Sequence, residues 1–314
     1  MRKRRLHRGL AVLLFLAMNL PVFAWGDQGH QTVAAIAAQN LTSAARLKIA
    51  TIIRAVPKSQ DDLKLKAMVG TSGTPSEAQI EKVLIKIAIW PDHMPGGKQE
   101  TEPWHYIDIG LFEGPSHWSE RCAGGACVVQ KISDMQQGIK ANQAFTRFAP
   151  DKELRFLVHF LGDIHQPLHC ATDADAGGNC IKTKNLGKEL HAVWDTPLVG
   201  LATSGTPHAA ATTLNSSLGS HKAEFQAELD PAKIASDSFD LAKTGAYGKA
   251  QPAVPVIDHF VDVRPKTCKQ QAPAEINALN VDANGSYNHQ VTLDLIREQL
   301  YKGGIRLAAI LNNL

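Results

Sequence analysis

The sequence predicts a single, mainly α-helical domain, and three observations lead to this prediction. Apolar residues recur at helical spacing in the stretch 154–169, LRFLVHFLGDIHQPLH. The C-terminal stretch from Thr292 to Asn313 is amphipathic over its length. The sequence also has no internal repeats and no convincing run of alternating apolar and polar residues, the pattern typical of strands. We therefore expect an all-helical architecture.

The first 24 residues have the composition of a signal peptide. The apolar run 10–20 is too short to span a bilayer comfortably, and small residues precede position 25. A basic leader precedes that run, with Arg2, Lys3, Arg4, Arg5 and Arg8. We therefore expect cleavage after Ala24, export to the periplasm or the cell exterior, one domain over residues 25–314, and no membrane partner.

The net charge argues against a protein that binds nucleic acid through basic side chains alone. The chain has 33 Lys and Arg against 30 Asp and Glu, and five of the basic residues lie in the leader, which has no acids. The mature chain thus carries 28 basic against 30 acidic residues, whereas proteins that bind phosphates through lysine and arginine are normally basic. An anionic ligand would need a local source of positive charge.

The five cysteines of an exported chain favour disulfides. Cys122 and Cys127 enclose the loop RCAGGAC and are predicted to pair. The preferred second pair is Cys170 with Cys180, which would leave Cys268 free, although the spacing leaves the pairing of these three open. Because Cys170 follows a histidine directly, a zinc-bound thiolate is the alternative for that residue.

Caps and helix breakers define the other elements. Thr42 or Ser43 caps a helix, and Ser76 with Gln79 forms a capping box. We expect helices at 31–39, 43–54, 76–89, 129–148, 190–195, 210–249 and 292–313, an extended segment at 104–108, and loops at 56–75, 94–103, 173–179 and 251–274.

The central helix carries a predicted pair of metal ligands. Asp151 is expected to cap this helix. His159 and Asp163 are four residues apart, so they share one face about 6 Å apart along the axis, where both can reach one metal ion. Pro167 stops the helix and turns His169 back toward its end.

Further fragments have the same metal-ligand chemistry. WGDQGH offers an N-terminal amine and an imidazole, WPD and WHYID offer a carboxylate and an imidazole, and LHAVWD repeats the spacing of four. The residues concerned are Trp25, His30, Asp92, His105, His191 and Asp195. An isolated His-x3-Asp is more often a solvated helix face, but the combination in one exported chain predicts a metal centre.

These motifs, together with HFLGDIHQPLH and GGN, resemble the three-zinc, single-strand-specific nucleases, the type I nucleases with 3′-nucleotidase activity that are related to the zinc phospholipases C. They run in the family's order from Trp25 to Asp195, and the C-terminal third matches only in helical character. The resemblance implies an all-helical domain of that type with a trinuclear zinc cluster in a cleft. It also implies hydrolysis of single-stranded DNA and RNA to 5′-nucleotides by a zinc-activated hydroxide, with 3′-nucleotides as further substrates; we expect a monomer.

The resemblance assigns ligands to three Zn²⁺ sites. The sites would be formed by Asp92, His105, His159 and Asp163; by His169, His191 and Asp195; and by the amine and carbonyl of Trp25 with His30 and a bridging Asp163. Asp92 and Asp163 are the expected catalytic carboxylates. Tyr106 would stack on a base and Asp108 would contact its edge. Three zinc ions leave a residual positive charge after their ligands are counted, which supplies the anion site.

One position departs from the family pattern. Pro95 stands where the family usually has a basic residue near the phosphate, and Lys98 or His93 could replace that residue. His165 is not a family ligand and is expected to be structural. The alternatives are a zinc phospholipase C, which Asp195 and the short spacing from Trp25 to the first histidine disfavour, and a non-catalytic zinc-binding protein, which Pro95 motivates.

Overall fold

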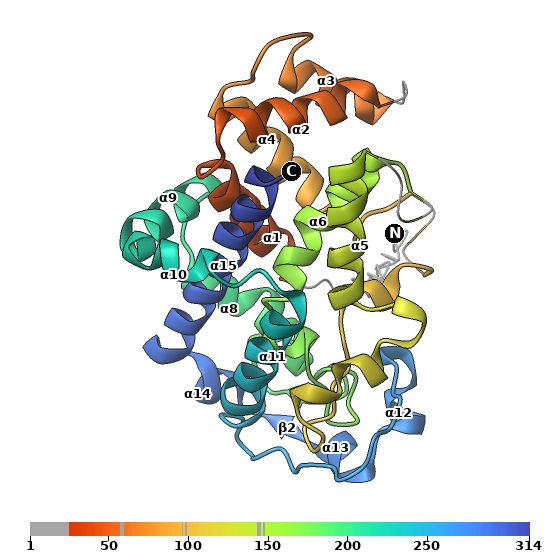
Figure 1. Ribbon diagram of the computed structural model, residues 1–314. Helices are drawn as coiled ribbons and strands as arrows, with labels where there is room; N and C mark the ends of the chain where they lie inside the picture. Colours follow the sequence, from red (N-terminus) through yellow and green to blue (C-terminus); the bar gives the residue numbers. More distant parts are fainter. Residues whose placement is uncertain (1–24, 57–59, 96, 98, 143–145, 147) are drawn as a thin grey trace, which may run out of the picture.

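The computed structural model describes residues 25–56, 60–95, 97, 99–142, 146 and 148–314. Helices dominate this part of the chain, and β1 (Lys182–Thr183) pairs in parallel with β2 (Asn280–Val281). The prediction of a mainly α fold is confirmed (Figure 1). The predicted signal peptide lies outside the described residues, and no helix among those described is long and apolar enough to cross a membrane.

The described residues form α-helices joined by turns, 3₁₀ helices and longer irregular segments. The α-helices are α1 (Asp27–Ala38), α2 (Ser43–Ala55), α3 (Gln60–Val69), α4 (Glu77–Ala88), α5 (Val128–Ala141), α6 (Pro150–Asp163), α7 (Leu190–Asp195), α8 (Pro197–Ala202), α9 (Pro207–Leu218), α10 (Lys222–Gln226), α11 (Pro231–Leu241), α12 (Cys268–Gln271), α13 (Ala274–Ala278), α14 (Ala283–Tyr287) and α15 (Gln290–Asn312). The 3₁₀ helices are η1 (Glu102–His105), η2 (Pro115–Arg121), η3 (Ala123–Gly125), η4 (Pro167–His169), η5 (Gly219–His221) and η7 (Pro265–Thr267), and η6 (Ala242–Tyr247) is a π-helix.

Helix α1 forms the centre of the core, where it packs against α15, α4 and α9 (Figure 1). Its run VAAIAA is fully buried, and its small side chains let neighbouring helices approach closely. The closest approach is to α15, where a Cβ at Gly304 would lie 2.4 Å from the Cβ of Ile36. A larger residue at position 304 would therefore push α15 away from α1.

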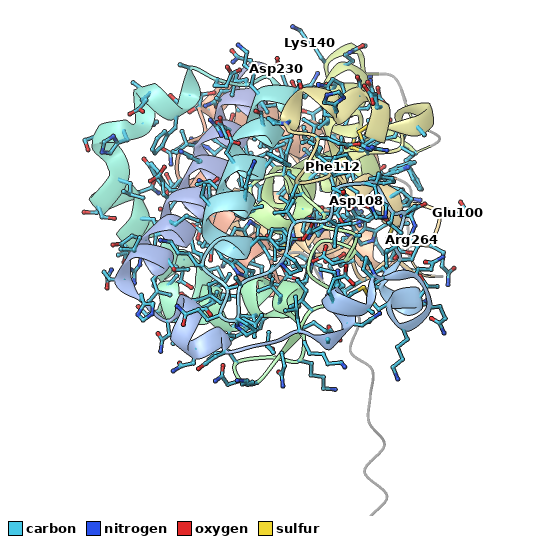
Figure 2. All side chains as sticks on the ribbon, turned by 90° about the horizontal axis from the view of Figure 1, so that it is seen from below. Glu100, Asp108, Phe112, Lys140, Asp230 and Arg264 are labelled. Carbon is cyan, nitrogen blue, oxygen red and sulfur yellow. A yellow bond between two sulfur atoms is a disulfide. The ribbon has the colours of Figure 1, made fainter. Side chains whose placement is uncertain are left out.

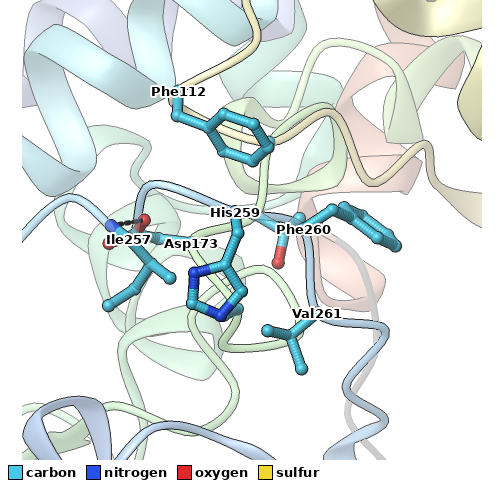
Figure 3. Close-up of a pocket in the computed structure, with 9 residues that line it drawn as sticks. Phe112, Asp173, Ile257, His259, Phe260 and Val261 are labelled. Carbon is cyan, nitrogen blue, oxygen red and sulfur yellow. Dashed lines mark hydrogen bonds between the residues drawn. The ribbon is translucent and has the colours of Figure 1, made fainter.

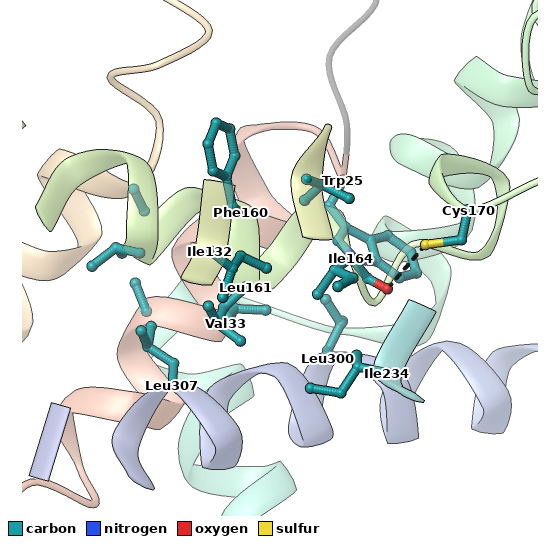
Figure 4. Packing of buried hydrophobic residues seen from close by; sticks show 14 of the residues in the cluster. Trp25, Val33, Ile132, Phe160, Leu161, Ile164, Cys170, Ile234, Leu300 and Leu307 are labelled. Atoms are coloured by element: carbon teal, nitrogen blue, oxygen red, sulfur yellow. Dashed lines mark hydrogen bonds between the residues drawn. The ribbon is translucent and has the colours of Figure 1, made fainter. Parts of the chain in front are cut away.

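Helix α6 lies beside α1 and is buried on all sides from Leu154 to Asp163. Figure 4 shows Phe160 and Leu161 of this helix within the core that includes Trp25 and Leu307. The predicted cap at Asp151 is wrong, because Ala149 is the N-cap and Pro150 occupies the first turn, where its fixed φ suits a helix start. The carboxylate of Asp151 instead lies 3.5 Å from Arg155 Nη2.

Other element boundaries also differ. The segment 210–249, predicted as helical, is divided among α9, η5, α10, α11 and η6, and the loop predicted at 251–274 contains η7 and α12. The helix predicted at 129–148 ends at Ala141, where Asn142 adopts a left-handed conformation with φ 52°, and residues 143–145 and 147 lie outside those described. The predicted connection 56–75 contains α3. Only the part of 104–108 after His105 is extended, because η1 includes His105. The caps at Thr42 and at Ser76 with Gln79 are confirmed.

The disulfides confirm one pairing and correct the other. Cys122 pairs with Cys127 as predicted, but Cys180 pairs with Cys268, so the predicted Cys170–Cys180 bond is wrong. The side chain of Cys170 faces the core, where its thiol donates to the carbonyl of Ile164 at 3.5 Å (Figure 4). Loop spacing cannot reveal this outcome, because the partner of Cys180 arrives from 88 residues away.

Candidate metal centre

Helices α1, α6 and α7, with the ends of η1 and η4, bring histidine and aspartate side chains together in the interior. Most of these side chains are almost fully buried, although imidazole and carboxylate groups are costly to bury without polar or metal partners. The side chains are those of His30, Asp92, His105, His159, Asp163, His169, His191 and Asp195. Every imidazole and carboxylate predicted as a ligand therefore lies in one region.

Asp163 lies at the middle of the first group. Its Oδ1 is 3.4 Å from His30 Nε2, and its Oδ2 is 3.0 Å from His105 Nδ1 and 3.3 Å from His159 Nε2. The carboxylate of Asp92 closes the group, at 3.7 Å from His159 Nε2 and 3.8 Å from His105 Nδ1. One oxygen of Asp163 thus faces α1 and the other faces the imidazoles of η1 and α6, an arrangement that suits a carboxylate shared between two metal ions.

The second group lies on η4 and α7. His169 Nε2 is 3.1 Å from His191 Nε2, and His191 Nε2 is 3.3 Å from Asp195 Oδ2. The other oxygen of Asp195 accepts a hydrogen bond of 2.7 Å from Gln166 Nε2. The ligand atoms of this group all lie within 4.8 Å of one another, as do those of His105, His159 and Asp163. The group offers three protein ligands, a number typical of catalytic zinc sites.

Three of the histidine rings are fixed by backbone carbonyls. Nδ1 of His159 lies 2.6 Å from the carbonyl of Ala88, Nδ1 of His169 lies 2.8 Å from that of His105, and Nδ1 of His191 lies 2.6 Å from that of Gly177. A nitrogen that bonds to a carbonyl must carry the proton, so Nε2 of each ring presents a lone pair to its group. This second contact is the usual support of a metal-bound histidine.

The donor set fits zinc. With both Nδ1 atoms protonated, the facing Nε2 atoms of His169 and His191 direct two lone pairs at the same space, which suits a shared cation. Two nitrogens on one tetrahedral zinc are about 3.3 Å apart, close to the observed separation. Neutral imidazoles and carboxylates are also preferred zinc ligands. Cys170 belongs to neither the first nor the second group of candidate ligands, and its thiol bonds to the carbonyl of Ile164, so nothing in the described residues supports the alternative of a thiolate ligand.

Glycines allow two of these rings to fit. A Cβ at Gly162 would lie 2.6 Å from His30 Nδ1, so this glycine of α6 lets α1 approach and lets the rings of His30 and His159 stack at 3.7 Å. Gly177 has φ +62° and presents the carbonyl that holds His191. The glycines of HFLGDIH and of GGN thus have a packing reason that the sequence motifs alone do not reveal.

The remaining predicted residues of the interior have separate positions. Trp25 is buried at the start of α1, and its carbonyl accepts a bond of 3.3 Å from the backbone N–H of His30. His165 lies outside both groups: its Nδ1 lies 2.7 Å from the carbonyl of Leu161 and its Nε2 is 2.9 Å from Arg306 Nη1. Burial and the charge of Arg306 hold the pKa of His165 well below its usual value, so it is a neutral acceptor for Arg306.

Tyr106 and Asp108 follow His105 directly and lie at the edge of the buried groups. The Nη1 of Arg264 donates to the Tyr106 hydroxyl, and Figure 2 shows Arg264 and Asp108 on the same side of the molecule. Burial raises the pKa of Asp108 to about 7, while the nearby charge of Arg264 opposes that rise. Sequence reasoning missed Arg264, because no motif or spacing links the segment 251–274 to Tyr106.

A small pocket marks the place where this segment crosses the loop between His169 and α7. Ile257, His259, Phe260 and Val261 line it, with Phe112 on the opposite side (Figure 3). The backbone N–H of Ile257 donates to Oδ1 of Asp173 at 2.8 Å. The predicted long loop is therefore ordered against the functional region.

Two residues were predicted to replace the basic residue that Pro95 displaces, and the structure describes only His93. His93 Nε2 lies 3.0 Å from Asp27 Oδ1, and both side chains are about half exposed. His93 therefore lies near the start of α1 beside an acid, which offsets any charge it carries. Lys98, the other predicted substitute, is outside the described residues.

Comparison with known proteins agrees with this geometry. The family model of the S1/P1 nuclease matches residues 25–314. The chain is 26% identical to Endonuclease 3 of Arabidopsis thaliana over 97% of this chain and 94% of that protein. It is 25% identical to Nuclease S1 of Aspergillus oryzae, over 95% and 94%, and 26% identical to Nuclease P1 of Penicillium citrinum, over 92% and 97%. The match extends over all the residues that the structure describes, and the chain belongs to the S1/P1 nuclease family.

Proposed function

We propose that this nuclease uses three zinc ions to hydrolyse single-stranded DNA and RNA to 5′-nucleotides, and that it also removes 3′-phosphates from nucleotides. The observation that carries the proposal is the carboxylate of Asp163, which lies 3.4 Å from His30 on one side and 3.0 Å from His105 on the other. A buried carboxylate between two sets of imidazoles suits two adjacent metal ions, and the group of His169, His191 and Asp195 suits a third.

The ligand assignment extends to the N-terminus. The ligands of the three ions would be Trp25, His30, Asp92, His105, His159, Asp163, His169, His191 and Asp195. Trp25 would contribute its amine and carbonyl once cleavage after Ala24 has freed the amine. This mature form, residues 25–314, would be a single domain that acts as a monomer in the periplasm or outside the cell.

The proposed chemistry divides between the ions and the chain's own groups. When bound, zinc ions act as Lewis acids and make hydroxide available near neutral pH. Asp92 and Asp163 are the proposed catalytic carboxylates, because each lies among imidazoles of the first group. The carbonyl-fixed rings of His169 and His191 keep their lone pairs in place, so little rearrangement is needed during the reaction.

Strand preference would arise at the edge of the metal centre. Tyr106 would stack on a base and Asp108 would contact its edge. Stacking contributes about 1–3 kcal/mol per base and accepts every base type. It requires a base that is not already stacked in a duplex, so single-stranded substrates would be cut faster.

One panel of substrates tests the proposal. A single zinc-loaded preparation would be assayed on single-stranded DNA, duplex DNA, RNA, a 3′-nucleotide and phosphatidylcholine. We expect hydrolysis of the first, third and fourth substrates and slow cutting of the duplex. Exclusive hydrolysis of phosphatidylcholine would indicate a phospholipase, and no chelator-sensitive hydrolysis of any substrate would indicate a non-catalytic zinc protein. Tyr106→Ala should raise KM for oligonucleotides more than for a small phosphodiester without a base.

A further inference from the structure

The segment between η6 and α13, residues 248–273, runs along the lower side of the molecule in the view of Figure 1 to the short helix α12. We call it the strap. Its only helices are the short η7 and α12, so its position depends on contacts with other parts of the chain and on buried side chains such as Ile257 and Val263. Ile257 bonds to Asp173, and Cys268 is joined to Cys180 by a disulfide. Both attachment points lie in or beside the loop 173–180, which precedes α7 and its ligands.

Two further contacts fix the middle of the strap. The guanidinium of Arg121 lies 3.6 Å from the centre of the Phe260 ring, a distance suited to a cation–π interaction. Four residues later in the chain, Arg264 Nη1 donates to the hydroxyl of Tyr106. The strap thus carries one cationic group to the aromatic residue that directly follows His105.

The charges around Arg264 determine how strongly it can attract phosphate. Its Nη2 lies 3.3 Å from Asp262, and Asp108 is near enough for its charge to interact with the guanidinium. The positive charge of one guanidinium is therefore shared between two carboxylates, so this edge is not a strong attractor of phosphate. The directional contact is the hydrogen bond to Tyr106, which restricts the swing of this side chain about its Cα–Cβ bond.

We propose that Arg264 is a positioning residue for the substrate base: the strap holds its guanidinium against the Tyr106 hydroxyl, which fixes the position of the ring on which an unpaired base stacks. This inference deepens the proposed function and rests on it. A preorganised ring loses less freedom when the base binds, so the benefit falls on substrates that carry a base. A backbone without bases gains nothing from the contact.

Two matched substrates test the proposal. One is a thymidine oligonucleotide, and the other is an oligomer of the same length and charge with abasic tetrahydrofuran units. Arg264→Met should raise KM for the thymidine oligomer by about three- to tenfold, in line with one lost hydrogen bond, and leave kcat nearly unchanged. KM for the abasic oligomer should not change. Lys266→Met removes an exposed charge of the same strap and is the control; it should alter neither substrate.

A double-mutant cycle tests whether Arg264 acts through Tyr106. Tyr106→Phe keeps the ring and removes the hydroxyl, so Arg264→Met should have little further effect on KM in that background. Arg264→Lys keeps a donor and should restore part of the affinity. Binding of thymidine 5′-monophosphate, measured by calorimetry, should follow the same order as KM.

The outcomes separate the two proposals. If the unaltered protein cuts neither oligomer, the proposed function fails. If it cuts both, and Arg264→Met impairs both equally or neither, the positioning role of Arg264 is wrong. Additive losses in the double-mutant cycle would also overturn it, because they would mean that Arg264 acts independently of the Tyr106 hydroxyl.

Discussion

The metal centre and the strap region differ in how their parts are held. In the candidate metal centre, most of the proposed ligands lie on α1, α6 and α7 or at the ends of η1 and η4, and three imidazoles are fixed by backbone carbonyls. At the strap, irregular chain is held by contacts with distant parts of the sequence, among them the Cys180–Cys268 disulfide and the hydrogen bonds of Ile257 and Arg264. We therefore expect the reaction to depend on side chains held in the core, and substrate choice to depend on an edge formed by irregular chain.

The largest expected effect concerns two histidines that differ in one contact. His159 and His165 are both fully buried and both bond through Nδ1 to a carbonyl, but Nε2 of His159 faces Asp163 whereas Nε2 of His165 faces Arg306. His159→Gln should lower the bound zinc and reduce activity by roughly a hundredfold or more. His165→Gln keeps an acceptor for Arg306 and should lower the melting temperature without changing the zinc content. Equal zinc contents in the two variants would contradict the assignment.

The next effect concerns the α-amine of Trp25, which removal of the signal peptide would free to bind zinc. A free α-amine can bind zinc near neutral pH because its reference pKa is about 7.7–8.0, whereas an amide nitrogen has no available lone pair. Residues that remain attached before Trp25 should therefore remove one zinc site and most phosphodiesterase activity while the protein still folds. The measurement compares zinc content and activity of the two forms. Full zinc content and the native rate in the extended form would mean that Trp25 is not a ligand.

The two disulfides enclose loops of different length, and only Cys180–Cys268 joins the strap to the rest of the chain. Cys180–Cys268 spans 88 residues and Cys122–Cys127 spans five. In the loop-entropy model these bonds contribute about 4–5 and about 2 kcal/mol to the free energy of unfolding. Serine at both cysteines of the longer bond should therefore give the larger fall in melting temperature. That change should also raise KM for oligonucleotides, and unchanged KM would show that the strap does not hold the edge of the site.

The smallest effect concerns the protonation of Asp108. Because burial raises its pKa to about 7, the carboxylate loses its proton as the pH rises through neutrality. The ionised form can accept a hydrogen bond from the imino N–H of thymine, so KM for a thymidine oligomer should fall by about two- to threefold between about pH 6 and about pH 8. Asp108→Asn should remove this part of the pH dependence. The same profile in both proteins would exclude a base contact by Asp108.

The sequence predicted the metal-binding half of the molecule better than the strap half. His159 and Asp163 are one helical turn apart, so their proximity follows from local structure, and α7 repeats the same spacing. The family resemblance then assigned the more distant ligands. The Asp151 cap was wrong for a local reason, because Pro150 moves the helix start to Ala149. Sequence reasoning could specify most of the core and the candidate ligands.

The strap could not be predicted in the same way. Its residues have no periodicity, and its attachments join positions that are far apart in the chain. Irregular segments are positioned by specific tertiary contacts, which neither propensity nor spacing encodes. The error at Cys170 and the omission of Arg264 have this common cause.

The central claim is that the buried histidines and aspartates bind three zinc ions that are needed for phosphodiester hydrolysis. The most direct measurement is a zinc titration of the chelated protein with a native Trp25 terminus, in which bound zinc, melting temperature and cutting of single-stranded DNA are followed together. We predict that all three rise with added zinc and that bound zinc approaches three ions per chain. A stable value of one ion, or full activity in the chelated protein, would contradict the claim.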